Sequence, residues 1–426
     1  MSTGPTTPSS GRVGTLLLSA LVKRTVLDGA GQPLGRLTDV VARLRGEDYP
    51  AVTGLVADVA GRHVFVPARE VLALDTDRLE MTSARVDLRR FERRPREVLL
   101  RADVLGHRLI DVDRARLVRA FDVALRHTGA GWEAAAVDVH RPGVLHRNAP
   151  AWRNWKDFEA LIGHQNSLRA RARLARLRRL KPAELADLIE GASPAEADDI
   201  LTRVHADPDL EADVFEELQD KPQSRLLEAR SDRDAADVLA HMRADDAADA
   251  VMELPPDRRR PIVDLLPAPQ RGKVLALLDH PAATAGGLMG LDYLSLPLSA
   301  TAGEALDAAR LGAALQPEAL VTIYCHDDTG RLTGAAALVT LLHHHPETGL
   351  ADIADLDPVH IHPDADLVDV ALTMSDYNLL TLPVTDQARQ ILGVITVDDI
   401  LEACIPSDWR RREPPTHSQP VPDDGD

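Results

Sequence analysis

Two pairs of acidic side chains in the second half of the chain have a spacing that suits a cation site. Asp245 and Asp249 stand four residues apart, and Asp399 and Glu402 stand three apart, so on a helix the members of each pair share one face. Mg²⁺ prefers carboxylate and water oxygens, and weak sites between two acidic surfaces suit this hydrated ion. Acids at helix starts also act as caps or stay solvated, and the spacing leaves that alternative open.

The charge of the chain is unevenly distributed along the sequence. The net charge is −18, but residues 184–260 hold 22 acids against nine bases, and residues 281–405 hold 18 acids against three bases. Residues 1–183 carry a positive excess. Two neighbouring acidic modules repel each other unless cations lie between them. The distribution therefore favours a contact between the two modules that depends on cations.

The chain lacks the motifs of the common catalytic classes. We find no G-x-S-x-G, H-E-x-x-H, P-loop or C-x-x-C pattern. Cys325 and Cys404 form no disulfide framework, which fits a reducing cytosol. The adjacent histidines at 343–345 would point in different directions on a helix, which disfavours a transition-metal site. We predict that the protein is not an enzyme.

Hydropathy predicts a soluble, cytoplasmic protein. The longest uncharged run, Leu332–Pro346, contains three histidines. It is shorter than the roughly 20 apolar residues that a membrane-spanning helix needs. The segment MSTGPTTPSSGR at the start lacks the charged-then-apolar pattern of a signal peptide.

The first internal repeat predicts β structure. Residues 24–41 are echoed by residues 107–124, and each copy is followed by an alternating or Val-rich run. The turn sequence DGAG after Leu27 suits a hairpin. These features predict two small β-barrel units. A basic segment follows, whose leucines we expect to pack inward while its arginines face the acidic modules.

Two further repeats predict an α-helical domain and a paired α/β domain. Blocks of twelve residues, most regular over 243–278, predict a superhelical stack of short helices. Residues 321–342 align without gaps on residues 380–401 as two βαββα units. The fold class is therefore multidomain α+β. We expect two β units over 12–150, a linker helix over 151–173, the helical domain over 174–280, the α/β pair over 281–405 and a disordered tail over 406–426.

Both parts resemble known families. The β units resemble PRC-barrel domains through Asp28, Gly31, Gly35, Asp39, Val40 and Val66-Pro67. Residues 174–405 resemble the cytosolic half of MgtE magnesium channels, a helical N domain joined to two CBS domains, through DDAADAVMELP, TAGGLM and GVITVDDIL in the family's order. The family's transmembrane helices would follow the second CBS domain and are absent, so we expect no transport by this polypeptide alone.

The resemblance to MgtE implies a set of Mg²⁺ ligands. Asp245 and Asp249 match Mg²⁺-binding positions of the family's N domain, while Asp399 and Glu402 match positions on the CBS side. Asp366, in the PDAD turn, is a further candidate. The sequences HPAAT and ALVTL replace more polar segments of the family, so some of its Mg²⁺ sites are expected to be missing and the affinity to be lower.

The resemblance to CBS pairs also implies a nucleotide site. Their ribose-binding pattern, G-h-x-(T/S)-x-x-D, is kept as Gly393, Thr396 and Asp399, so the cofactors implied are Mg²⁺ and ATP or AMP. In the first unit Ala337 and Thr340 replace the hydroxyl and the carboxylate. Thr396 and Asp399 could instead merely cap the last helix, and this alternative stays open.

These expectations combine into a Mg²⁺-responsive regulatory protein. We expect a homodimer through the CBS domains, and a membrane metal transporter as a partner docked by the β units. An adenine-nucleotide sensor is the alternative. A third possibility is a nucleic-acid-binding protein acting through the basic first part. It is disfavoured because aromatic side chains for base stacking are missing among the arginines.

Overall fold

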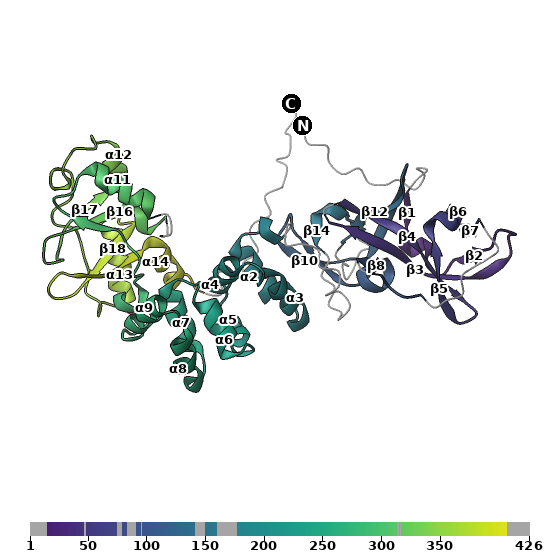
Figure 1. Ribbon diagram of the computed structural model, residues 1–426, viewed down its shortest axis with the longest axis horizontal. Coiled ribbons are helices and arrows are strands. Elements are labelled where there is room, and N and C mark those ends of the chain that lie inside the picture. Colours follow the sequence, from purple (N-terminus) through teal and green to yellow (C-terminus); the bar gives the residue numbers. More distant parts are fainter. Residues whose placement is uncertain are drawn as a thin grey trace, which may run out of the picture. The chain divides into compact units, whose positions relative to one another are not determined.

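The computed structural model describes residues 15–46, 48–74, 79–82, 91–94, 96–140, 150–159, 177–312, 315 and 317–406. It divides into two compact units, residues 1–217 and 218–426. The first unit contains a β domain followed by helices α2 to α4 (Figure 1). The second contains the later helices and a pair of α/β halves.

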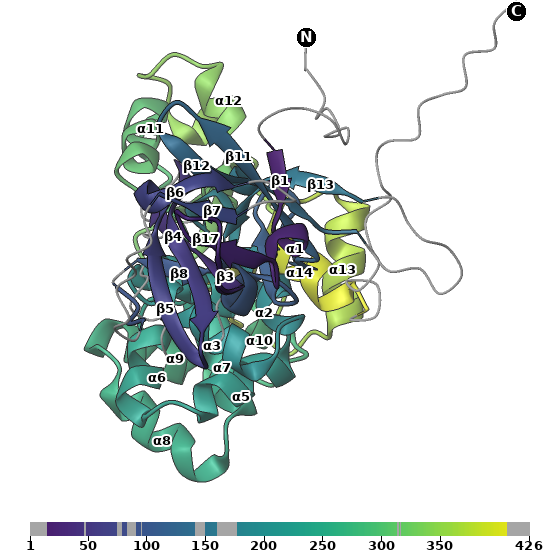
Figure 2. The ribbon, with the colours of Figure 1, turned by 90° about the vertical axis from the view of Figure 1, so that its right-hand side faces the viewer.

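The β domain is built from short strands and two long ones, β3 and β4, which pair with each other, and β4 also pairs with β5 (Figure 2). Among the described residues, eleven strands form one sheet: eight follow the path β1-β11-β12-β4-β3-β2-β7-β6, and β13, β5 and β8 pair with β12, β4 and β3 off this path. A second sheet has the order β10-β9-β14. One apolar cluster, drawn from residues between 16 and 158, fills the domain. The strands are β1 (Thr15–Leu17), β2 (Thr25–Leu27), β3 (Pro33–Arg45), β4 (Asp48–Val59), β5 (Arg62–Pro67), β6 (Val71–Leu74), β7 (Leu79–Met81), β8 (Glu97–Leu99), β9 (Arg108–Asp111), β10 (Arg116–Arg119), β11 (Asp122–Thr128), β12 (Gly131–Asp138), β13 (Trp152–Asn154) and β14 (Phe158–Glu159).

The two sequence repeats of this domain exchange their leading segments. Strand β1 precedes the first repeat but pairs with β11 of the second, whereas β8 precedes the second repeat and pairs with β3 of the first. The helical turn after each exchanged strand is held by the matching aspartate of the other repeat. Asp122 accepts a hydrogen bond from the Ser19 amide of helix α1 (Leu18–Leu21) at 3.0 Å, and Asp39 accepts one from the Arg101 amide of the π-helical turn η2 (Leu100–Val104) at 2.8 Å.

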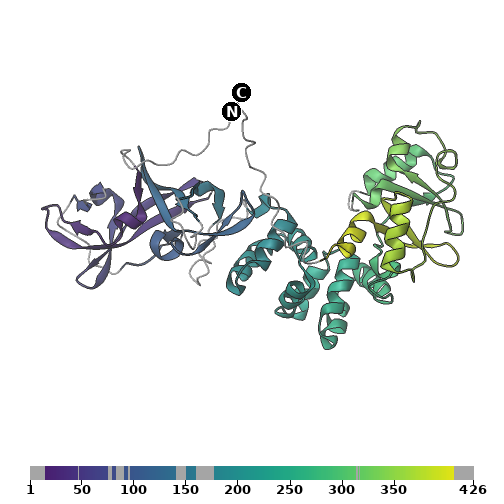
Figure 3. The ribbon, with the colours of Figure 1, turned by 180° about the vertical axis from the view of Figure 1, so that it is seen from behind.

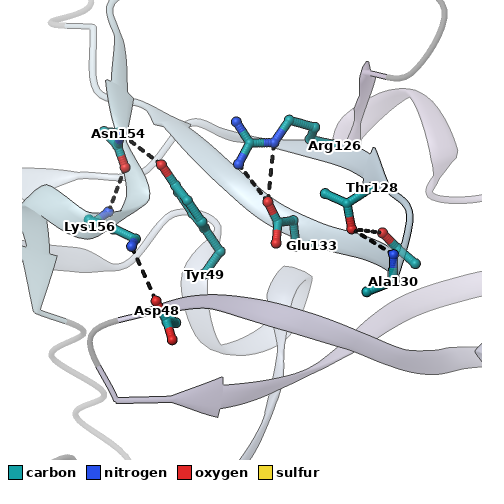
Figure 4. Close-up of polar contacts among 9 residues, drawn as sticks. Asp48, Tyr49, Arg126, Thr128, Ala130, Glu133, Asn154 and Lys156 are labelled. Atoms are coloured by element: carbon teal, nitrogen blue, oxygen red, sulfur yellow. Dashed lines mark hydrogen bonds and ion pairs between the residues drawn. The ribbon is translucent and has the colours of Figure 1, made fainter.

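Side-chain contacts reinforce the joint between the repeats (Figure 4). The Tyr49 ring of the first repeat lies between two cations, with the Arg126 guanidinium 4.7 Å and the Lys156 ammonium 4.8 Å from its centre. Its hydroxyl accepts a hydrogen bond from Asn154 at 3.0 Å. Because one sheet and one core join the repeats, the two predicted β units are parts of a single domain. The PRC-barrel resemblance stays a prediction.

The expected linker helix does not begin at residue 151. Residues 152–159 form β13, the 3₁₀ turn η3 (Trp155–Asp157) and β14. Trp155 and Phe158 are buried in the core of the β domain, and their burial holds this segment to the sheets. The rest of the predicted linker, including most of its arginines, lies outside the described residues, as does the predicted tail from residue 407. At the end of the basic segment Leu177 and Leu180 are buried, as predicted for its leucines.

The predicted twelve-residue repeat is confirmed in the helices. Helices α7, α8 and α9 begin at residues 244, 256 and 268. Proline at the first turn of most of these helices suits their starts, because its missing N–H would be unpaired there anyway. The helices are α2 (Pro182–Glu190), α3 (Pro194–Val204), α4 (Pro208–Glu216), α5 (Asp220–Glu228), α6 (Asp232–Leu239), α7 (Ala244–Glu253), α8 (Pro256–Leu265) and α9 (Ala268–Leu278).

The paired α/β region has two halves that pack side by side, seen in green and yellow in Figure 3. The Tyr324 hydroxyl of the first half donates to Thr381 of the second at 2.8 Å, and both groups are buried. No helix of the described residues is long and apolar enough to cross a membrane. The elements are α10 (Ala285–Leu288), β15 (Ser295–Pro297), α11 (Ala302–Leu311), β16 (Thr322–His326), β17 (Leu332–Ala337), α12 (Leu338–Leu342), α13 (Leu367–Asp376), β18 (Thr381–Thr385), β19 (Ile391–Thr396) and α14 (Val397–Cys404).

The exchange of segments can be tested by removing its aspartates. Asp39→Ala and Asp122→Ala should each lower the free energy of unfolding by about 1–3 kcal/mol, because each removes the buried carboxylate that accepts hydrogen bonds from part-buried backbone amides. Asp48→Ala, which removes an exposed ion pair with Lys156, should cost less than about 1 kcal/mol. Urea unfolding measures all three. Equal effects of the three substitutions would contradict the structural role of the buried pair.

Candidate functional site

Helix α7 carries two of the predicted ligands toward the second α/β half. Arg243 is its N-cap residue, and Asp245 and Asp249 follow on one face. The Asp245 carboxylate lies close to Gly290, since a Cβ placed on that glycine would be 3.9 Å from Oδ2. Gly290 in turn exchanges two backbone hydrogen bonds of 2.9 Å with Val394 of β19. This pairing places the α7 acids beside the start of α14.

Asp399 of α14 uses its two carboxylate oxygens differently. Oδ2 accepts hydrogen bonds from the Thr396 amide at 2.7 Å and from the Thr396 hydroxyl at 2.9 Å, which together cap the helix. Oδ1 lies 3.6 Å from Nη1 of Arg243. The capping role considered for Thr396 and Asp399 is therefore present, and Oδ1 is the oxygen that faces α7.

These groups line a cavity of about 200 Å³. Its polar wall includes Arg243, Asp245, Asp292, Thr396 and Asp399. Asp292 also forms an ion pair of 2.6 Å with Lys273 of α9. The cavity thus collects three carboxylates from separate segments of the chain, with one arginine among them.

Burial and mutual repulsion raise the pKa of the acids in this cluster. Loss of hydration, followed by the charges of neighbouring acids that include Asp245 and Glu402, raises the pKa of Asp249 to about 7. Asp249 remains exposed to solvent, which screens part of that repulsion. Loss of hydration also raises the pKa of Asp399 to about 6, and the charge of Asp245 adds to it. The pKa of Asp245 is raised by loss of hydration, while Arg243 opposes the change.

The structure brings together four of the five predicted metal ligands. Asp245 and Asp399 line the same cavity, the charges of Asp245 and Glu402 help to raise the pKa of Asp249, and the charge of Asp245 helps to raise that of Asp399. Asp366 instead caps α13, where its carboxylate accepts a hydrogen bond from the Asp369 amide at 2.9 Å. Among the described residues, no group of three or more His, Cys, Asp or Glu side chains is arranged closely enough to hold a metal ion directly.

Sequence reasoning missed two members of the cluster, Arg243 and Asp292. Arg243 directly precedes the DDAAD motif, so its place at the helix start could have been noticed. Asp292 follows TAGGLMGL and is brought in only by the pairing of Gly290 with Val394. No local pattern marks that contact.

Gly393, the first residue of the nucleotide pattern, has a packing role. A Cβ at this position would lie 2.7 Å from the Gly290 carbonyl oxygen and 2.8 Å from the Met289 side chain. The segment that follows α10 therefore needs glycine here to approach β19. Thr396 and Asp399 remain within the cavity, so nucleotide binding by them stays a prediction.

Comparison with known proteins agrees with these features. Residues 180–283 match the family model of the MgtE intracellular N domain, and residues 350–405 match that of the CBS domain. The magnesium transporter MgtE of Thermus thermophilus is 36% identical over 127 residues, 30% of this chain, and that of Enterococcus faecalis is 32% identical over 126 residues, also 30% of this chain. The chain covers 28% of the length of each of these relatives.

Two solved structures have a similar fold. The cytosolic domain of the Mg²⁺ channel MgtE in complex with ATP is 28% identical, with a TM-score of 0.53, and the match covers 57% of this chain and 99% of that one. The soluble part of a magnesium transporter is 26% identical, with a TM-score of 0.50, and that match covers 54% of this chain and 90% of the other.

The raised pKa values predict a pH dependence of stability. A carboxyl group whose pKa is higher in the folded than in the unfolded state stabilises the fold below its unfolded pKa, and this contribution is lost as the pH rises through the folded value. In the absence of divalent cations, stability should therefore fall between about pH 4 and pH 7, where Asp249 and Asp399 ionise. Asp249→Asn should be more stable than wild type at pH 8 and show a flatter profile.

Thermal melting between pH 5 and pH 8 in the presence of a chelator measures this effect. Asp237→Asn, at an exposed site on α6, is the matched control and should keep the wild-type slope. An Asp249→Asn variant that is less stable than wild type at pH 8 would show that the carboxylate is favourably paired, contrary to the expectation.

Arg243 should act as the cation that the chain itself supplies to the cluster. Arg243→Ala should lower stability without divalent cations, because Asp245 and Asp399 lose the positive charge that offsets their repulsion. The stabilisation gained on adding Mg²⁺ should increase in the same variant. Melting with and without MgCl₂ tests both, with Arg260→Ala on α8, an exposed i,i+4 pair, as control. Higher metal-free stability of Arg243→Ala would overturn this interpretation.

Proposed function

Because the chain carries an MgtE intracellular N domain at residues 180–283 and a CBS domain at residues 350–405, we propose that it is a Mg²⁺-responsive regulatory protein. In this proposal Mg²⁺ bridges α7 of the N domain and α14 of the CBS region. The observation that carries it is the cavity that Asp245 of α7 and Asp399 of α14 line together, where the charge of Asp245 raises the pKa of Asp399.

The chemistry of the cluster favours a hydrated divalent cation. Asp245 of α7 and Asp399 of α14 line the cavity of about 200 Å³, which has room for water. Mg²⁺ usually keeps several water ligands and contacts few carboxylates directly. A bridging hydrated ion therefore needs no tight cage of three protein ligands. Binding would neutralise the repulsion and hold α7 against α14.

Regulation of magnesium transport is the role that we propose for this response. The similar proteins are magnesium transporters, and this chain matches the family models of the MgtE intracellular N domain and the CBS domain. We infer that the chain acts without catalysis, in the cytoplasm, on a membrane metal transporter. The two states of the α7–α14 contact would present different surfaces to that partner.

A homodimer through the CBS region is part of the proposal. Helices α13 and α14 expose large apolar side chains that include Val368, Leu372 and Leu401, with 63%, 55% and 52% of their surfaces accessible. Val368 and Leu372 stand one helical turn apart, so they share a face. Apolar faces of this kind favour burial against a second protein surface.

Adenine-nucleotide sensing is the second candidate. It is favoured by one observation, the similarity to an MgtE cytosolic domain solved in complex with ATP. Thr396 and Asp399 would hold the ribose in this case. Their mutual capping bonds would have to rearrange, because the Asp399 oxygen Oδ2 already accepts two hydrogen bonds from Thr396.

Melting of the full chain across Mg²⁺ concentrations tests the proposed function. At a Mg²⁺ concentration a hundredfold above the dissociation constant, wild type should gain about 2.7 kcal/mol of stability. The double variant Asp245→Asn/Asp249→Asn should gain nothing, and Asp366→Asn, changed in a helix cap outside the cluster, should respond like wild type. Loss of the response in Asp366→Asn would add that residue to the site.

The same assay separates the two candidates. A wild-type protein indifferent to Mg²⁺ but stabilised by ATP in the presence of a chelator would place nucleotide sensing first. That stabilisation should then be lost in Thr396→Val, which has no hydroxyl to offer a ribose. Indifference to both ligands would contradict both candidates.

A further inference from the structure

One face of the β9–β14 strand pair carries charged side chains at defined positions. In the register of the sheet Glu159 lies opposite Ile110, and Arg108 stands two residues before Ile110 on the same strand. Because side chains alternate along a strand and cross-strand partners share a face, these three residues lie on one side of the sheet. Leu109, on the other side, joins the core of the β domain.

Helix α3 carries a complementary row of charges. Glu196, Asp199 and Arg203 stand three and four residues apart, so they follow one face of the helix. The order along the helix is two acids and then a base. The sheet face offers a base from β9 and an acid from β14.

Two sets of ion pairs join these faces. In one set the arginine belongs to the sheet and the acid to the helix, and in the other the arginine belongs to the helix and the acid to the sheet. Arg108 of β9 forms a two-pronged ion pair with the Glu196 carboxylate, with 2.9 Å between Nε and Oε1, and its third nitrogen donates to the Gly191 carbonyl oxygen at 3.2 Å. In the reverse direction, Arg203 of α3 donates to Glu159 of β14 at 3.0 Å and to Asp199 at 2.8 Å.

The burial of these groups separates them from ordinary surface pairs. The side chains of Arg203 and Glu159 keep only 17% and 9% of their surfaces accessible, and Ile110 between the charged positions is completely buried. The hydrogen bonds from Arg108 hold the pKa of Glu196 at about 2. Bidentate, charge-assisted ion pairs that are partly shielded from water fix the orientation of the helix on the sheet as well as its distance from it. A charge left there without its partner would be strongly unfavourable.

We propose that this face of β9 and β14 is a docking surface for an acidic helix, occupied within the chain by α3. The β domain and helices α2 to α4 then form one rigid body. The two faces select each other by charge order, because a helix without an acid opposite Arg108 and a base opposite Glu159 would leave both charges unpaired. The proposal gives the β domain a partner inside the chain, and it is independent of Mg²⁺ binding.

Pulsed electron resonance on the full chain tests whether the two parts move as one. Spin labels at Ala130→Cys, on the exposed β11–β12 turn, and at Asp209→Cys, on exposed α4, report the separation across the boundary. Cys404→Ser removes the exposed native cysteine, and Cys325 is buried. A docked pair should give one narrow distance distribution. Arg108→Glu, which places an acid against Glu196, should abolish that single narrow distance.

A second variant and a control complete the experiment. Arg203→Ala removes the other cation of the interface and leaves the sequence of the β domain unchanged. It should broaden the distance distribution as well. Arg260→Glu reverses an arginine of an exposed pair on α8 and should leave the narrow distance unchanged. Circular dichroism establishes that each variant is folded. A broad distribution in the parent protein, or a narrow one in both interface variants, would overturn the proposal whatever the response to Mg²⁺.

Discussion

Carboxylates crowded between α7 and α14 are held together by contacts that do not depend on charge. The mutual backbone hydrogen bonds of Gly290 and Val394, and the close approach of Met289 to Gly393, fix the segment that lies against Asp245. Asp245 and Asp399 line the same cavity, and their repulsion can be offset by a proton, by Arg243 or by an added cation.

The first unit uses the same kinds of charges to the opposite effect. Between β9, β14 and α3 the acids meet arginines of the chain itself, so that Glu196 and Glu159 are both paired. A contact whose acids are already paired with arginines gains little from an added cation. In the contact of β9 and β14 with α3, the acids are thus paired with arginines of the chain itself. In the contact of α7 with α14, an added cation could offset the repulsion, and this difference would confine a response to Mg²⁺ to the second unit.

The β domain shows how a repeat in sequence need not be a unit in structure. The strand and helical turn before each repeat pack against the other repeat. There the backbone amides of the turn donate hydrogen bonds to the matching aspartates Asp39 and Asp122. Neither repeat would satisfy its buried carboxylate alone. The exchange gives the domain a single core. Strands β9 and β14 pair with each other, and their outer face contacts α3.

The sequence by itself determined the features that depend on neighbours along the chain. Helix starts, the twelve-residue spacing and the pairing of Asp245 with Asp249 on one face follow from local caps and periodicity. The tertiary structure alone decided which distant groups meet. Ser19 bonds to Asp122 across 103 positions, and Arg243 approaches Asp399 of another domain. Such contacts depend on how strands pair and layers pack, and no local pattern of side chains encodes that geometry.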